Sequence, residues 1–183
     1  MRHIPNAITV LRVLLIPVLA WLLMERNYAG AFAVFALAAA SDFADGVIAR
    51  RFQLVTEFGA RLDPIADKLT MLVATVMLAV LGWVPEWLAA AIVLRDVVIV
   101  SGAVAYHMVV GRVDIAPTWL SKLNTALEFA VLTLVLADAA SAADFRAVMP
   151  WLFVLVFCTV VASGLQYVWV WGRKARAHAR GRG

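Results

Sequence analysis

The sequence contains little charge, a single cysteine and no internal repeat. Charged residues make up 15% of its 183 positions, whereas hydrophobic residues make up 64% and the mean hydropathy is +0.91. One soluble core does not need so much apolar surface, so the composition indicates a membrane protein about one domain long. Cys158 has no second cysteine to pair with, which excludes an internal disulfide. The amino-terminal apolar stretch lacks a small-residue cleavage site, so we expect this segment to be retained.

Apolar segments long enough to cross a bilayer, roughly 20 residues each, recur along the whole chain. Short breaks that are polar or contain proline and glycine separate them into residues 5–24, 29–50, 62–82, 87–110, 118–138 and 148–171. This pattern predicts an all-α integral membrane bundle of six transmembrane helices. We expect one membrane domain over residues 1–172 and a disordered basic tail over residues 173–183.

Basic residues are distributed unevenly around these segments. If the amino terminus is cytoplasmic, the opposite side keeps only Arg26 and Arg146, and Arg95 lies within a span. Because lysine and arginine favour the cytoplasmic side, both termini are predicted to be cytoplasmic. The net charge of +4 then describes a tail lying against anionic lipid headgroups. We expect no nucleic-acid partner, because the basic residues flank spans and form no separate soluble domain.

Four aspartates interrupt the apolar pattern between the second and third segments. Asp42 and Asp45 are three residues apart and Asp63 and Asp67 are four apart, so each pair shares one face of a helix. Carboxylates that meet in a low-dielectric site repel one another unless divalent cations lie between them. An all-oxygen ligand set favours Mg²⁺ or Mn²⁺ over zinc. The alternative is a charged loop in which Asp63 caps a helix before Pro64, which leaves the other three unexplained.

Residues 42–67 follow the pattern D-x2-D-G-x2-A-R-x8-G-x3-D-x3-D. This pattern resembles the signature of the CDP-alcohol phosphatidyltransferases, integral membrane enzymes of phospholipid synthesis, and has no departure from it. The resemblance implies transfer of a phosphatidyl group from CDP-diacylglycerol to an alcohol, release of CMP, two Mg²⁺ or Mn²⁺ ions and a homodimer. We expect an enzyme of the bacterial inner (plasma) membrane whose active site faces the cytoplasm. By the family pattern the metal ligands are Asp42, Asp45, Asp63 and Asp67, and Asp67 is also the candidate catalytic base.

The same resemblance suggests a binding site for the nucleotide part of the CDP-lipid. Its expected residues are Asn6, Thr9, Asp45, Gly46, Ala49, Arg50 and Gly59. Glycine lets the nucleotide approach the backbone, and arginine can hold phosphate oxygens by paired hydrogen bonds. The alternatives are that glycine and alanine pack helices, that Asn6 begins a helix after Pro5, and that Arg50 is a positive-inside anchor.

Two basic residues in the second half are candidates for binding the acceptor. Arg95 lies well inside the fourth segment, where an ionisable residue marks either a ligand pathway or an ion pair, here with Glu128 as the expected partner. Lys122 begins the fifth segment on the cytoplasmic side and could do similar work with Ser121 and Asn124.

The identity of the acceptor stays open at this point. The stretch NAITVLRVLLIP resembles both phosphatidylglycerophosphate synthases and CMP-forming cardiolipin synthases, whereas Arg95-Asp96 followed by PTWLSKLNTALEF is more similar to the latter. The expected acceptor is therefore glycerol 3-phosphate or phosphatidylglycerol, with inositol phosphate or serine as alternatives. A membrane cation transporter is the alternative from another class, because intramembrane aspartates also line ion paths. Such a protein would carry acidic groups in both halves, whereas here they crowd one hairpin.

Overall fold

The structure is a computed structural model that describes residues 4–52, 57–110 and 118–180, with side chains described for residues 11, 13–41, 66–106, 108 and 118–173. All regular structure in these residues is helical, which confirms the predicted all-α class. The helices are α1 (Ile4–Met24), α2 (Tyr28–Phe52), α3 (Glu57–Val80), α4 (Glu86–Val110), α5 (Trp119–Ala139) and α6 (Met149–Arg180).

Short polar side chains and one glycine set several of the helix ends. Asn27 precedes α2 and its Oδ1 accepts a hydrogen bond from the backbone N–H of Gly30 at 3.0 Å. Thr118 precedes α5 and its Oγ1 accepts from the N–H of Ser121 at 3.2 Å. Both side chains satisfy an N–H group that the first turn of a helix leaves without a partner. After α3, Gly82 adopts a φ of 79°, the left-handed conformation that commonly ends a helix.

The predicted segments match the helices closely, with two differences at polar ends. α3 begins at Glu57 instead of residue 62, and α6 continues to Arg180 instead of ending near residue 171. Residues 173–180, which we expected to be disordered, are therefore helical. The prediction followed apolar character, whereas these added turns contain residues such as alanine and arginine, whose intrinsic propensity favours helix.

Length and composition identify three of the helices as able to cross a membrane. Within the part of the chain that the structure describes, these are Glu86–Tyr106, Trp119–Ala139 and Met149–Arg173. Shorter apolar stretches occur at Val13–Met24 and Tyr28–Ser41. The structure thus supports a membrane-embedded helical protein, while the six crossings stay a prediction.

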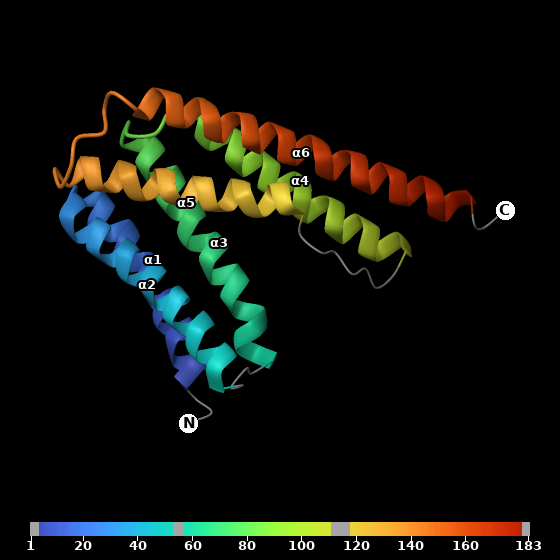
Figure 1. The fold of residues 1–183 in the computed structure, drawn as a ribbon, viewed down its shortest axis with the longest axis horizontal. Coiled ribbons are helices and arrows are strands. Elements are labelled where there is room, and N and C mark those ends of the chain that lie inside the picture. The colour runs from blue at the N-terminus through green and yellow to red at the C-terminus, as the bar shows by residue number, and fades with distance from the viewer. Residues whose placement is uncertain (1–3, 53–56, 111–117, 181–183) are drawn as a thin grey trace. The chain divides into compact units, whose positions relative to one another are not determined.

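The chain divides into two compact units. The first unit contains residues Met1–Val84 and Leu132–Ala147, and in it α1 packs against both α2 and α3. Its core includes Leu19, Leu23, Phe35 and Leu78, all almost fully buried. The second unit contains residues Pro85–Val131 and Val148–Gly183, in which α4 and α6 lie side by side (Figure 1).

In the second unit the usual distribution of polar and apolar side chains is partly inverted. Arg95, Asn124, Glu128 and Ser163 are buried. Large apolar side chains are instead exposed, namely those of Leu94, Val97, Val100, Trp151, Leu165 and Trp169. Apolar side chains are stable on the outside of a helical unit when lipid surrounds it, so this arrangement suits a bilayer.

Candidate active site

The aspartate motif lies on two consecutive helices of the first unit. α2 carries Asp42, Asp45, Gly46, Ala49 and Arg50, and α3 carries Gly59, Asp63 and Asp67. Both halves of the motif are helical, as the spacing predicted. The prediction that each aspartate pair occupies one helix face therefore rests on real helical segments.

The aspartates lie at matching distances from the end of the hairpin. Asp45 precedes the end of α2 at Phe52 by seven residues, and Asp63 follows the start of α3 at Glu57 by six. At the helical rise these separations are about 10 Å and about 9 Å, and those of Asp42 and Asp67 are both about 15 Å. Each of the two helices thus carries one aspartate about 9–10 Å and another about 15 Å from its end at the hairpin. The Asp67 side chain is half-buried, while the side chains of Asp42, Asp45 and Asp63 lie outside the described residues, so their convergence stays a prediction.

Asn6 and Thr9 lie on α1 of the same unit, whose helix packs against both α2 and α3. Their side chains, and those of Arg50 and the other predicted nucleotide-binding positions, lie outside the described residues. The arrangement places three helices with predicted donor-binding residues in one unit. Among the side chains that are described, no three His, Cys, Asp or Glu residues gather into a metal-binding group.

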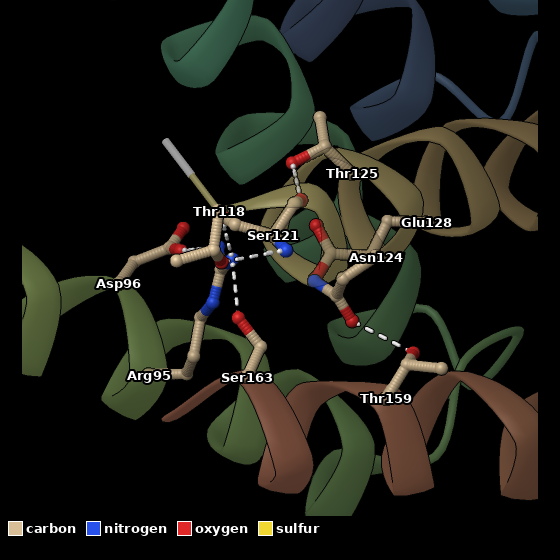
Figure 2. A network of polar contacts seen from close by, with 9 residues as sticks. All are labelled: Arg95, Asp96, Thr118, Ser121, Asn124, Thr125, Glu128, Thr159 and Ser163. Atoms are coloured by element: carbon tan, nitrogen blue, oxygen red, sulfur yellow. Dashed lines mark hydrogen bonds and ion pairs between the residues drawn. The ribbon is translucent and has the colours of Figure 1, made fainter. Parts of the chain in front are cut away.

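Arg95 is the centre of a polar network in the second unit (Figure 2). Its Nη1 donates to Asp96 Oδ1 at 2.9 Å, and its Nη2 donates to Ser121 Oγ on α5 at 2.7 Å and to Ser163 Oγ on α6 at 3.0 Å. The guanidinium therefore joins three helices. Only 5% of Arg95 is exposed, so these contacts replace the water that the charge has lost.

The Arg95 guanidinium retains hydrogen-bonding capacity that the protein does not use. Its Nε is buried and has no hydrogen-bond partner. Two of its three partners are neutral hydroxyls, so among the described side chains Asp96 alone supplies a formal negative charge bonded to it. A buried N–H without an acceptor is destabilising by about 1–3 kcal/mol. An arginine in this state is suited to bind an oxyanion, such as a phosphate oxygen.

A second polar group lies next to the first along α5 and α6. Asn124 is fully buried, and its Nδ2 donates to Glu128 Oε1 at 2.6 Å. The Thr159 hydroxyl on α6 lies 2.8 Å from Asn124 Oδ1 and 2.8 Å from the Val156 carbonyl oxygen of its own helix, so its single hydrogen is shared between two acceptors. The ion pair expected between Arg95 and Glu128 is therefore wrong, because Arg95 pairs with Asp96 and Glu128 accepts from the nearby amide.

The two predicted acceptor-binding residues differ in exposure. Arg95 is buried in the network, whereas Lys122 is exposed and the bonds around Arg95 come from other side chains. Sequence reasoning suggested Ser121 and Asn124 but missed Ser163 and Thr159. The signal that could have found them is a pair of hydroxyl residues four positions apart, on one face of an otherwise apolar helix.

Comparison with known proteins identifies the family. Residues 2–162 match the CDP-alcohol phosphatidyltransferase family. The chain is 40% identical to a CDP-diacylglycerol–glycerol-3-phosphate 3-phosphatidyltransferase of Pseudomonas fluorescens, over 84% of this chain and 82% of that protein. It is 32% identical to a CMP-forming cardiolipin synthase of Rattus norvegicus, over 93% of this chain and 62% of that protein. It is 35% identical to a cardiolipin synthase and hydrolase fusion protein of Schizosaccharomyces pombe, but spans only 30% of that protein.

The chain belongs to the CDP-alcohol phosphatidyltransferase family. The family predicted from the aspartate motif is therefore confirmed, and so is the prediction of an enzyme. The cation-transporter alternative has no support from these relatives, whose names describe phosphatidyl transfer and cardiolipin synthesis.

Proposed function

We propose that this enzyme transfers the phosphatidyl group of CDP-diacylglycerol to a glycerol-type acceptor and releases CMP. The observation that carries the proposal is the family match over residues 2–162, which includes the complete aspartate motif on α2 and α3. Glycerol 3-phosphate is the acceptor we favour, because the Pseudomonas relative named for it aligns over most of both chains. Phosphatidylglycerol is the second candidate, since the rat relative is named as a cardiolipin synthase.

The donor half of the reaction is assigned to the first unit. A set of four aspartates contains only oxygen donors, which fits two hard divalent cations such as Mg²⁺ or Mn²⁺. Asp42, Asp45, Asp63 and Asp67 would hold them, and the ions would neutralise the charge that develops on the pyrophosphate. Arg50 would hold phosphate oxygens, while Gly46, Ala49 and Gly59 would leave room for the nucleotide, with Asn6 and Thr9 beside it.

The chemical step needs one proton acceptor. The acceptor oxygen forms a bond to the phosphorus of the phosphatidyl group while the bond from that phosphorus to the CMP oxygen breaks. The hydroxyl proton passes to the carboxylate of Asp67, which acts as general base. CMP leaves with the electron pair of the broken bond, and the phosphatidyl group remains on the acceptor. Orientation and electrostatic stabilisation supply most of the rate enhancement in such phosphoryl transfers.

The acceptor half is assigned to the second unit. Arg95 would bind the acceptor's phosphate with its guanidinium, and the exposed Lys122 would attract the same negative charge. The buried and fixed geometry of Arg95 suits selective binding, whereas Lys122 on the surface suits long-range attraction.

The setting we propose is a bacterial inner membrane, with six helices crossing it, both termini in the cytoplasm and the active site on the cytoplasmic face. The distribution of basic residues supports this orientation. Labelling of single cysteines placed in the α1–α2 and α2–α3 connections would test it, and the proposal requires only the second to react from the cytoplasm. A homodimer is proposed from family resemblance alone, and the mass of the protein in detergent would test it.

The acceptor assay decides the function. Purified protein is given CDP-diacylglycerol in detergent micelles with glycerol 3-phosphate, phosphatidylglycerol, inositol phosphate or serine, and CMP release is followed. We expect glycerol 3-phosphate to give the highest kcat/KM. Release with phosphatidylglycerol alone would establish the second candidate, and release only with inositol phosphate or serine would refute the glycerol-type assignment.

A further inference from the structure

Two polar contacts join α5 to α6 within the second unit (Figure 2). In the first, Ser121 and Ser163 accept from the same nitrogen of Arg95. In the second, Thr159 donates to Asn124 on α5, and it shares its one hydrogen with the Val156 carbonyl on α6. The first contact binds a charged group on α4, whereas the second is made only between α5 and α6.

The two contacts lie close together along α5 and α6, so the second contact fixes the relative position of the two serines in the first. Asn124 follows Ser121 by three residues on α5, and Thr159 precedes Ser163 by four on α6. These intervals correspond to about 4.5 Å and about 6 Å along the two helix axes. Residue numbers increase along one helix as they decrease along the other, so α5 and α6 run antiparallel here. A helical segment this short is stiff, and the Asn124–Thr159 contact therefore sets where Ser121 lies relative to Ser163.

Hydrocarbon side chains alone would not set this register. Val156 and Val160 are buried on α6, and apolar surfaces of this kind can slide by a fraction of a turn at little cost in a membrane, where lipid is an equally apolar neighbour. Serine side chains are short, and the bonds of 2.7 and 3.0 Å to one nitrogen tolerate little displacement. Asn124 is fully buried, and both ends of its amide are bonded.

We propose that Asn124 and Thr159 are positioning residues for Arg95, and that their hydrogen bond sets the affinity of the enzyme for the phosphate of its acceptor. Neither residue touches the acceptor in this proposal. They keep the two serines at the separation that holds the Arg95 fork in one orientation. The inference rests on the proposed role of Arg95 in acceptor binding.

The first test removes the hydroxyl of Thr159 while keeping its shape. Thr159→Val should raise the KM for glycerol 3-phosphate about 3- to 10-fold, the change in an equilibrium that the loss of one hydrogen bond between membrane helices produces. The kcat and the KM for CDP-diacylglycerol should stay within twofold of the wild-type values. Thr159→Ser restores the hydroxyl and should restore the acceptor KM. Thr125→Val is the matched control, because the Thr125 hydroxyl donates to the Ser121 carbonyl on its own helix at 3.1 Å.

A double-mutant cycle separates positioning from a general packing effect. If Thr159 acts through the serines, Thr159→Val should add little to the acceptor KM once Ser163→Ala has loosened Arg95. The proposal is overturned if the two substitutions raise the acceptor KM independently, so that their fold-changes multiply in the double variant. It is also overturned if Thr159→Val raises the KM for CDP-diacylglycerol as much as it raises the acceptor KM. If Thr159→Val gives no folded protein, Thr159→Ala takes its place. Failure of both to fold would also overturn it, since the pair would then serve folding and not acceptor binding.

The outcome also distinguishes this proposal from the one on which it rests. If Arg95→Lys leaves the acceptor KM unchanged, the role of Arg95 in acceptor binding is wrong. If Arg95→Lys raises that KM but Thr159→Val does not, the role of Arg95 stands and the positioning role of Asn124 and Thr159 is wrong.

Discussion

Ser121 on α5 and Ser163 on α6 both accept a hydrogen bond from the same nitrogen of Arg95, at 2.7 and 3.0 Å. Both hydrogens of that nitrogen are therefore used, and the plane of the guanidinium is fixed. Because serine hydroxyls are neutral, this fixation does not neutralise the arginine, and Asp96 offsets its charge only from one end. The second unit thus holds a buried cation that is fixed in orientation by neutral groups.

Replacing Arg95 with lysine tests this arrangement directly. An ammonium group keeps the charge but has no planar fork, so it cannot reach both serines and Asp96 in the present geometry. We expect the KM for glycerol 3-phosphate to rise about 10-fold or more, as for the loss of a hydrogen bond to a charged group. The KM for CDP-diacylglycerol should stay within twofold. Arg146→Lys, on an exposed position between α5 and α6, is the control. Equal increases in both KM values for the Arg95 variant would contradict a role confined to the acceptor.

Asp67→Asn tests the general base. The carboxamide has nearly the same shape as the carboxylate but cannot take the acceptor's proton, so kcat should fall at least about 100-fold. Binding of the CDP-lipid, measured separately by calorimetry in micelles, should be largely kept. Asp138→Asn is the control, because the Asp138 Oδ1 accepts from the N–H of Phe145 at 3.3 Å and an asparagine oxygen can do the same. Near-normal CMP release from Asp67→Asn would remove the base role.

The helices could be predicted from the sequence because each contains a long apolar segment, and polar residues, proline or glycine separate these segments. The segment predicted at residues 87–110 is α4, Glu86–Val110, since Pro85 precedes it and a polar break follows. The start of α3 at Glu57 could not be found this way. Its first turns include charged residues that favour helix, and a search for long apolar segments does not detect them.

The candidate site divides in the same way. The aspartate motif and Arg95 stand out in an apolar sequence because ionisable groups there are costly, so they could be found at once. The spacing of Thr159 and Ser163 marks a polar face of α6, but it does not identify their partners, because these depend on which face of α6 turns toward α4 and α5. The packing of α4, α5 and α6 decides which face this is, and the local sequence pattern does not predict that packing.

Removal of divalent cations should stop the reaction and loosen the first unit. Without cations the four aspartates would repel one another, and a ligand that binds only the folded protein stabilises it. We expect chelation to abolish CMP release and lower the Tm in detergent, and Mg²⁺ or Mn²⁺ to restore both. Asp63→Ala should weaken the rise in Tm with Mg²⁺. Undiminished CMP release after complete chelation would contradict the assignment of a metal-dependent enzyme.

The contact between Gly102 on α4 and Trp171 on α6 provides a test of how the second unit is held together. A Cβ at Gly102 would lie 3.1 Å from both Cδ1 and Nε1 of Trp171, whose ring also packs on Tyr106 with centroids 5.1 Å apart. Gly102→Val should therefore push the indole aside and destabilise the protein by about 1–3 kcal/mol, the usual effect of overpacking. Gly172→Ala is the matched control on α6, because a Cβ there meets nothing within 4 Å and alanine favours the helix by up to about 1 kcal/mol. Thermal unfolding in detergent should give a lowered Tm for the first variant and an unchanged or raised Tm for the second. Equal values of Tm for the two variants would mean that the α4–α6 pairing does not depend on this close approach.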